Sequence, residues 1–472
     1  MNDDSTSRLV AGIRAWIRDA PAGAQLPSTR QLVAEYAASP VTVQKALRRL
    51  AAEGLLETRP GVGTFVRTVR PSRGPDFGWQ SAALRTPRSV IPRIAGPLQT
   101  APPGAQALHA GYPGPDLLPE RLVRAALGRA ARGAAATSRP PSAGLQELRA
   151  WFAAELATST RQDLAPVTAN DVVIAPGSQS ALSSIFRALV APGQALLVES
   201  PTYWGAIQAA HQAGVEPVPV PVASDGTGPD PEELDRSFRE TGARAFYAQP
   251  NYANPTGAQW SLARAEEILD VVRAHGAFVV DDDWAHDFGI DTDPRPLAAL
   301  DDGGHVVYLR SLTKSMSPSI RVAAVIARGP ARDRILADRA AESMYVSGLL
   351  QQAALDVVSD PGWRTHLRRL REQLRDRRGL LVDSLRAHAP ELQLDLVPPG
   401  GLHLWCRLPD GTDVDRLVRD CANEGVWISS GDEWFPAEPS GPHLRLTFIG
   451  PDPAGYPDAV RTIARMLAAQ GS

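Results

Sequence analysis

The sequence predicts a multidomain protein: a small N-terminal domain of helices and one hairpin, an α/β domain with a mainly parallel sheet, and a smaller α+β domain at the C-terminus. Three observations support this prediction. The 472 residues exceed the length of one ordinary domain. Residues 1–70 hold ten basic and six acidic side chains, a net charge of +4, although the whole chain carries −3. From about residue 106 onward, strand-like segments alternate with helical ones, as in a parallel sheet covered by helices.

Composition narrows the classes of protein. Hydrophobic residues make up 43% of the chain and charged residues 21%, as in globular proteins, and no apolar run approaches the length of a membrane span. The opening MNDDSTSR has neither the basic start nor the apolar stretch of a signal peptide, so we expect a cytoplasmic protein without a membrane partner. Cys406 and Cys421 form no CxxC or Cys/His spacing, so the sequence predicts no disulfide framework and no metal site.

The first seventy residues contain three helical patterns and a hairpin. Apolar spacing predicts helices over residues 7–18, 26–38 and 39–54, and residues 55–67 read as a short hairpin around a Pro-Gly turn. The third helix would leave its basic and polar side chains outside. Its buried residues would be Val43, Ala46, Leu47 and Leu50. This pattern suits a winged helix-turn-helix whose third helix enters the major groove of DNA, although any small helical bundle with a solvated basic face fits it too.

The amino-acid sequence of this region is more specific than its pattern of helices and hairpin. LPSTRQLV, SPVTVQKAL and EGLLETRPGVGTFV closely resemble the DNA-binding domain of GntR-family regulators over nearly all of residues 7–67. The resemblance implies double-stranded DNA as a partner and places these residues near it: Arg30, Ser39, Thr42, Gln44 and the wing around Gly61. Pro40 stands where many family members have Arg, so one expected DNA contact is missing. Lys45 is either a substitute for that contact or a solvated surface lysine.

A linker is predicted over residues 69–105, which are rich in Pro, Arg, Gly and Ser and show no sustained periodicity. It separates a domain over 1–68 from one over 106–472, with a large part at about 140–340 and a small part at about 345–472. Strands of the large part are expected in DVVIAPG, QALLVESP, VEPVPVPV, ARAFYAQP, AFVVDDD, HVVYLRS and RVAAVIA. The small part combines a long helix, 363–388, with the strands LHLWCRL and HLRLTFI.

Polar motifs follow these strands, and open α/β sheets bind ligands beyond the carboxyl ends of their strands. GSQSAL opens a helix whose N–H groups can bind a phosphate, Tyr203 follows the second strand, and Asn254 begins a turn after the fourth. Three carboxylates at 281–283 end the fifth strand and require a nearby cation, a metal or solvent. SLTKSMSPSIR follows the sixth strand. Each motif alone could equally be a helix cap, a packing aromatic, a turn or a solvated strand end.

Lysine is rare in this chain: of 49 Lys and Arg residues, only Lys45 and Lys314 are lysine. Arginine cannot form a Schiff base, whereas a deprotonated lysine can, so Lys314 is a candidate for amine chemistry unless its survival is chance. A phosphorylated aldehyde cofactor needs an amine, phosphate-binding groups, a carboxylate for a pyridinium and an aromatic platform. The motifs at the strand ends supply all of these.

GSQSAL, ESPTY, NPTG, FVVDDD and SLTKSMSPSIR together resemble the core of fold-type-I enzymes that use pyridoxal 5'-phosphate (PLP). SAGLQELRAWFAAEL, PPGGLHLW and HLRLTF extend the resemblance over most of residues 106–450. Joined to a GntR-like domain, this aminotransferase-like core resembles the MocR subfamily of bacterial regulators, which implies a homodimer, often arranged head to tail. The resemblance implies an aldimine at Lys314 and these further ligand contacts: Asp282 at the pyridine nitrogen, Asn254 at the ring hydroxyl, Tyr203 on the ring, Ser178, Gln179, Ser311, Thr313 and Arg321 around the phosphate, and Arg445 at the carboxylate of an amino acid.

Trp284 departs from the family, which usually has a Tyr there whose phenol contacts the ring hydroxyl. An indole offers only an N–H donor without a titratable proton, but that N–H can still donate to the phenolate oxygen of the ring, so we expect cofactor binding to survive. The favoured hypothesis is a DNA-binding transcriptional regulator that senses PLP, or an amino-acid or amine effector, at Lys314. The alternative is a working aminotransferase with an accessory DNA-binding domain. A DNA-binding protein with an inactive cofactor site is disfavoured because the other site residues are in place.

Overall fold

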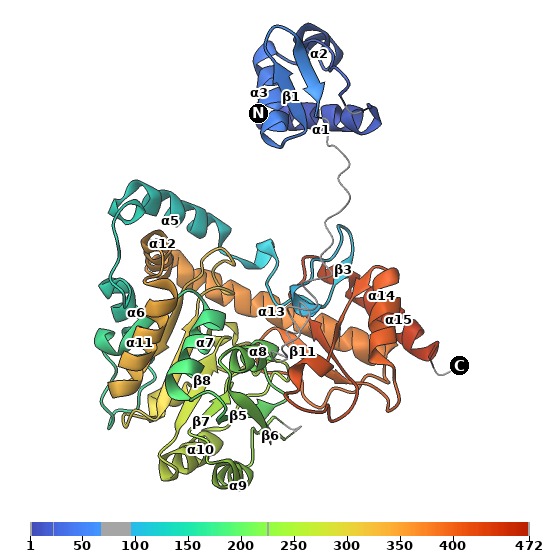
Figure 1. The fold of residues 1–472 in the computed structure, drawn as a ribbon. Coiled ribbons are helices and arrows are strands. Elements are labelled where there is room, and N and C mark those ends of the chain that lie inside the picture. The colour runs from blue at the N-terminus through green and yellow to red at the C-terminus, as the bar shows by residue number, and fades with distance from the viewer. Residues whose placement is uncertain (1, 22, 68–95, 224–225, 471–472) are drawn as a thin grey trace. The chain divides into compact units, whose positions relative to one another are not determined.

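The computed structural model describes residues 2–21, 23–67, 96–223 and 226–470. The chain divides into two compact units, Met1–Arg88 and Ser89–Ser472 (Figure 1). Most of the predicted linker, residues 69–95, lies outside the described residues. Its last part contains the 3-10 helix η1 (Gly96–Leu98), which belongs to the second unit and is held by a 3.0 Å hydrogen bond from the Gly96 N–H to Glu433. No described helix is long and apolar enough to cross a membrane.

The first unit folds into three helices and an antiparallel hairpin, as the apolar spacing predicts. Its elements are α1 (Asn2–Asp19), α2 (Thr29–Glu35), α3 (Pro40–Ala52), β1 (Leu56–Arg59) and β2 (Gly63–Val66). Helix α2 is shorter than predicted because Ser28 begins it with a capping box. Val43, Ala46 and Leu50 of α3 are buried, as expected, whereas Leu47 is only half-buried.

A seven-stranded sheet forms the centre of the second unit, in the order β4-β10-β9-β8-β7-β5-β6. Its strands are β4 (Val172–Ala175), β5 (Ala195–Ser200), β6 (Glu216–Pro221), β7 (Ala245–Ala248), β8 (Phe278–Asp283), β9 (Val306–Ser311) and β10 (Ala323–Ile326). Only β10 runs antiparallel to its neighbours, so the prediction of a mainly parallel sheet is confirmed.

Helices cover both faces of this sheet because its strands are apolar on both sides. Tyr247, Val280 and Leu309 pack with α7 and α8, whereas the alternate residues Phe246 and Val279 pack in a second core with α6, α9 and α10. The helices of this large part are α5 (Glu120–Arg132), α6 (Gln146–Ala157), α7 (Ser178–Leu189), α8 (Trp204–Gln212), α9 (Pro231–Thr241), α10 (Leu262–Ala274), α11 (Gly329–Ser343) and α12 (Gly348–Val358).

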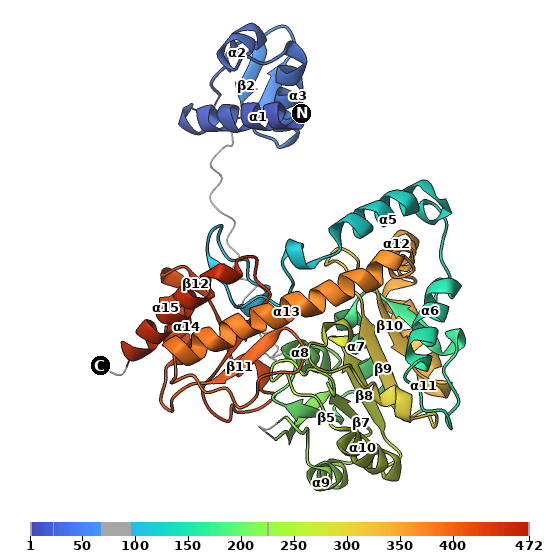
Figure 2. The same ribbon diagram turned by 180° about the vertical axis from the view of Figure 1, so that it is seen from behind.

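The small part is an α+β layer with its own core. Its elements are β3 (Gln106–Ala107), β11 (His403–Arg407), α14 (Val414–Asn423), β12 (Val426–Trp427), β13 (Ser429–Ser430), β14 (His443–Thr447) and α15 (Tyr456–Ala468). The 28-residue helix α13 (Pro361–His388) joins it to the large part, as Figure 2 shows from behind. Trp363, near the start of α13, is buried in the core of the large part, and Leu385, near its end, is buried in that of the small part.

Candidate functional site

The candidate site lies where the strands of the large sheet end. Strands β4, β5, β7, β8 and β9 all run in the same direction, so the segments that follow them meet at one edge of the sheet. These segments carry Gly177 and Ser178, Tyr203, Asn254, Asp282, and Ser311 to Lys314. Strand β14 of the small part adds Arg445. The fold thus brings the predicted residues of the second unit into one site.

Lys314 is the partly buried amine of the site. Its Nζ lies 4.1 Å from the centre of the Trp284 ring. Burial, followed by the Arg445 charge, lowers the pKa of Lys314 to about 7, although Asp282 acts in the opposite direction. A large fraction of this amine is therefore unprotonated near neutral pH, which is the form that attacks an aldehyde.

The three consecutive aspartates are buried and divide between the two faces of the sheet, since side chains alternate along a strand. Asp282 accepts hydrogen bonds from the Tyr247 hydroxyl at 2.7 Å and the Gln249 amide at 3.0 Å, and burial raises its pKa to about 6. Asp281 accepts from a backbone N–H at 2.8 Å, and Asp283 accepts from the Tyr308 hydroxyl at 2.7 Å. The alternative of a solvated strand end is therefore wrong. Lys314 is a cation that acts on Asp282.

A cradle for an anion lies at the start of helix α7. Gly177, with φ +91°, precedes the helix, and a Cβ at this position would lie 2.5 Å from the Arg321 guanidinium. Within the described part of the chain, Arg321 has no carboxylate partner, and the hydroxyl of buried Thr313 bonds to nothing. A guanidinium, a free hydroxyl and the N–H groups of a helix start are what a phosphate requires. Ser311 accepts a 3.2 Å bond from the Thr313 N–H and so shapes this loop.

Gln179 is placed differently from its predicted role at a phosphate. Its amide donates to the Gly205 carbonyl at 2.7 Å and its amide oxygen accepts from the Tyr203 hydroxyl at 3.1 Å. The side chain therefore fixes Tyr203. The backbone N–H of Gln179, in the first turn of α7, can still donate to a phosphate. Burial raises the pKa of Tyr203, so its phenol stays protonated.

Arg445 is a buried cation without a carboxylate partner among the described residues. It donates to the His109 carbonyl at 2.6 Å and to Asn254 Oδ1 at 3.3 Å, and it lies 4.7 Å over the Trp434 ring. Its Nε is buried without a partner, and burial lowers its pKa to about 9. A buried guanidinium in this state is stabilised by a carboxylate supplied from outside the chain.

Two aromatic side chains that matter here were not predicted from the sequence. Trp434 donates to Asn254 at 3.2 Å, and His403 lies 3.1 Å from Arg445 through Nε2 and stacks on Trp284 at 5.7 Å. Burial, with the charges of Arg445 and Lys314, holds the pKa of His403 well below its usual range. His403 is therefore neutral and accepts from Arg445. A histidine inside the apolar strand LHLWCRL was the available signal.

The site residues fit PLP. Asp282 Oδ1, Trp284 Nε1, the Thr313 hydroxyl and Arg445 Nε are buried without a hydrogen-bond partner among the described residues. One acceptor and several donors can therefore bind groups of a ligand. The acceptor suits a protonated pyridine nitrogen. The donors suit a ring hydroxyl, a phosphate and a carboxylate.

The DNA-contact residues of the first unit occupy its helix-turn-helix and wing. Arg30, Gln44 and Lys45 are exposed, and Thr42 is half-buried. Ser39 is exposed but caps α3 by accepting a 3.1 Å bond from the Thr42 N–H, so its hydroxyl already has a structural role. Gly61, with φ +75°, lies at the tip of the hairpin with open space around it.

Comparison with known proteins agrees with this geometry. Residues 111–463 match the family described as aminotransferase class I and II. The chain belongs to this family. Residues 5–66 match the gntR family of bacterial regulatory proteins, so the first unit is a GntR-type DNA-binding domain. Together these matches give the domain order of the MocR subfamily.

Relatives include both regulators and transaminases. The probable rhizopine catabolism regulatory protein MocR of Rhizobium meliloti is 27% identical over 96% of this chain and 91% of its own length. The 2-aminoadipate transaminase of Thermus thermophilus is 28% identical over 78% of this chain and 91% of its own. The solved structure of LysN from T. thermophilus, complexed with N-(5'-phosphopyridoxyl)-L-leucine, superposes with a TM-score of 0.71 at 27% identity, over 78% of this chain and 93% of that chain. PLP is therefore the cofactor of this site.

Proposed function

We propose that this protein is a DNA-binding transcriptional regulator that holds PLP at Lys314 and responds to PLP itself or to an amino-acid or amine effector. The observation that carries the proposal is the joining, in one chain, of a GntR-type domain to a site with a low-pKa amine and two cations without carboxylate partners in the described chain. Two relatives named as transcriptional or catabolism regulators align with 91% and 96% of this chain, and so with both domains.

The side chains have separate tasks in this proposal. PLP supplies an aldehyde and an electron-withdrawing ring. Lys314 would offer the amine, and Asp282, whose carboxylate is oriented by Tyr247 and Gln249, would keep the pyridine nitrogen protonated. Arg321, Ser178, Ser311 and Thr313 would hold the phosphate, and Tyr203, fixed by Gln179, would contact the ring. Asn254 and Trp284 would bind the ring hydroxyl, and Arg445 would bind the carboxylate of the effector.

On the DNA side, we assign Gln44 and Thr42 to base edges, and Arg30, Lys45 and the wing at Gly61 to the phosphate backbone. We also propose the domain boundaries 1–68 and 106–472, with a linker at 69–105 whose last part is hydrogen-bonded to the second unit. Two copies of the chain, joined head to tail through their aminotransferase-like domains, would present two such DNA-binding domains to paired half-sites. An effector that alters the domain around Lys314 then alters the spacing of the pair.

The test is a titration of the full-length protein onto the DNA beside its own gene. We expect salt-dependent binding whose affinity changes when PLP or one amino acid or amine from a panel is added. Lys314→Ala should still bind DNA but lose that response. Binding that ignores every compound of the panel, or the absence of binding, contradicts the regulator.

The second candidate function, a working aminotransferase, is favoured by one observation: of the catalytic constellation that the resemblance implies, only the Tyr at position 284 is replaced. Trp284 Nε1 has no acceptor in the described chain, so an indole donor is available where the phenol would be. Multiple turnovers of an amino acid and a 2-oxo acid by the wild type, with no binding to promoter DNA, would favour the enzyme. Under the regulator proposal, Trp284→Tyr should raise turnover and leave DNA affinity unchanged.

A further inference from the structure

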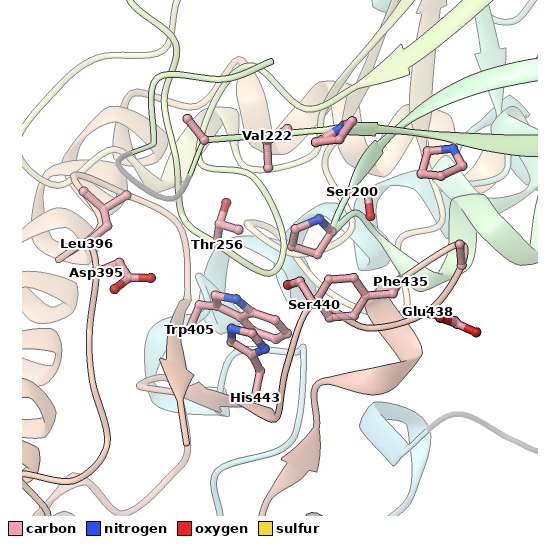
Figure 3. A pocket seen from close by; sticks show the side chains of 15 residues that line it. Ser200, Val222, Thr256, Asp395, Leu396, Trp405, Phe435, Glu438, Ser440 and His443 are labelled. Carbon is pink, nitrogen blue, oxygen red and sulfur yellow. The ribbon is translucent and has the colours of Figure 1, made fainter. Parts of the chain in front are cut away.

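A second cavity lies in the second unit, apart from the residues around Lys314. It has a volume of about 370 Å³, within the range of small-molecule sites. Its lining comes from the end of β5, from β6 and the segment after it, from the turn after β7, and from the small part. Figure 3 shows Trp405, His443 and Phe435 along one wall, with Asp395 and Glu438 toward opposite ends.

Aromatic rings build one wall of this cavity, and we call it the aromatic pocket. The rings of Trp405 and His443 stack 4.8 Å apart at an angle of 8°. Phe435 lies 6.2 Å from Trp405 and 6.0 Å from His443. Prolines, Val222 and Leu396 provide further apolar surface. A ligand with a flat or extended apolar body would find contact on both sides.

The charges of the aromatic pocket are negative. Asp395 and Glu438 are the only acidic residues among the fifteen that line it, and this lining includes no Lys or Arg. His443 Nδ1 lies 2.8 Å from the Gly441 carbonyl, to which it can only donate, and burial lowers the pKa of His443. The ring is therefore neutral, with Nε2 as an acceptor. Carboxylates, an imidazole acceptor and aromatic faces all favour a cation.

This preference is opposite to that of the cofactor site, where Arg321 and Arg445 favour anions. The two sites are nonetheless linked through one ring. Trp405, in the pocket wall, meets Trp434 edge to face at 6.3 Å. Trp434 in turn bonds to Asn254 at 3.2 Å and lies under the Arg445 guanidinium at 4.7 Å. A ligand on Trp405 is thus one aromatic side chain away from two residues of the cofactor site.

We propose that the aromatic pocket binds an elongated organic ammonium compound, best matched by a diamine, with its apolar body on Trp405 and Phe435 and its cationic ends toward Asp395 and Glu438. The site is separate from Lys314 and does not depend on the DNA-binding function. The two exposed carboxylates contribute little each, and cation–π contact adds about 0.5–2 kcal/mol, so the affinity should be modest.

Hexamethonium is the probe for this proposal because a bis-quaternary ammonium cannot form a Schiff base, so it cannot report on Lys314. Isothermal titration calorimetry of the PLP-loaded full-length protein should show binding. The double variant Asp395→Asn/Glu438→Gln and, separately, Trp405→Leu should each weaken that binding about tenfold or more. A matched control, Glu372→Gln/Asp376→Asn on the exposed face of α13, removes the same charge elsewhere and should bind as the wild type does.

Two results with hexamethonium would overturn the proposal. One is the absence of hexamethonium binding to the wild type up to about 10 mM. The other is equal affinity in the wild type and the Asp395/Glu438 variant, which would place any binding outside the pocket. The visible spectrum of bound PLP serves as the folding control for each variant. Both acids are exposed and neither belongs to the cofactor site, so their replacement should leave that spectrum unchanged. Suberate, a dianion of similar length, should not bind the pocket, and its binding there would also contradict the charge argument.

Discussion

The molecule contains two cationic regions that differ in burial. In the first unit, Arg30 and Lys45 lie exposed on the helix-turn-helix, and even the paired Arg14 keeps 48% of its side chain in solvent. In the second unit, Arg445 is 1% exposed and Lys314 is partly buried, and burial lowers the pKa of both. Exposed cations attract a polyanion over a distance that salt shortens, whereas buried cations hold one ligand at contact distance. Exposed positive charge therefore suits recognition of a long polymer, whereas buried positive charge suits the anionic groups of one small ligand.

Replacing Lys314 tests the buried region most severely. Lys314→Ala removes the amine, so we expect complete loss of covalently attached PLP, measured by mass spectrometry after borohydride reduction. The matched control is Lys45→Ala, which removes the chain's other lysine. The control should keep PLP at the wild-type level. Reducible PLP that persists in Lys314→Ala would move the attachment to Lys45 and refute the assignment.

Salt separates the two regions directly. Raising the salt from about 50 to 200 mM should weaken DNA binding about 10³-fold if paired domains neutralise about six phosphates. The same change should leave PLP on the protein, since its contacts are buried and covalent. Fluorescence anisotropy of labelled DNA and the visible spectrum of PLP can be followed in one sample. PLP loss that parallels DNA loss would show that the two cationic regions are not physically distinct.

The pH dependence of PLP attachment sharpens the contrast further. Because the folded pKa of Lys314 is about 7, its neutral form grows about tenfold between about pH 6 and pH 8. The rate at which PLP adds to the apoprotein should rise by the same factor over this range, as stopped-flow absorbance can measure. Asp282 raises the pKa of Lys314, so Asp282→Asn should shift the profile toward lower pH. If the rate of PLP addition still rises above about pH 9, the pKa of Lys314 is that of an ordinary lysine.

His403 tests whether the buried cation needs a neutral partner. His403→Phe removes the acceptor 3.1 Å from Arg445 and keeps a ring against Trp284. Because a hydrogen bond to a charged group contributes about 1.5–3 kcal/mol, affinity for the best amino acid of a panel should fall about tenfold or more, read from the PLP spectrum. His403→Gln restores an acceptor and should recover part of the loss. Equal affinities in all three proteins would show that His403 does not position Arg445.

The sequence predicted the residues expected to contact the cofactor better than the residues that hold those side chains in place. Lys314, Asp282 and Asn254 could be predicted because each follows or ends a strand, and parallel strands end at one edge. The alternation of side chains along a strand also predicts that Asp281 and Asp283 lie on the opposite face of the sheet from Asp282. His403 could not be paired with Arg445, since their proximity depends on the register of β11 and β14, 42 residues apart in sequence. Such non-local register has no local signal.

Ser39 gives the smallest predicted effect and decides how much of the exposed region is structural. Its hydroxyl caps α3 through the Thr42 N–H at 3.1 Å and also meets the Thr42 hydroxyl at 2.9 Å. Ser39→Ala should lower the free energy of unfolding of the first unit by about 1 kcal/mol, whereas Ser39→Gly, a tolerated cap, should cost only a few tenths. Thermal melts of both variants test this. If Ser39 also donates to a phosphate, both variants lose DNA affinity equally despite their different stabilities. If it acts only as a cap, DNA affinity follows stability, because α3 then loses nothing but the order of its first turn.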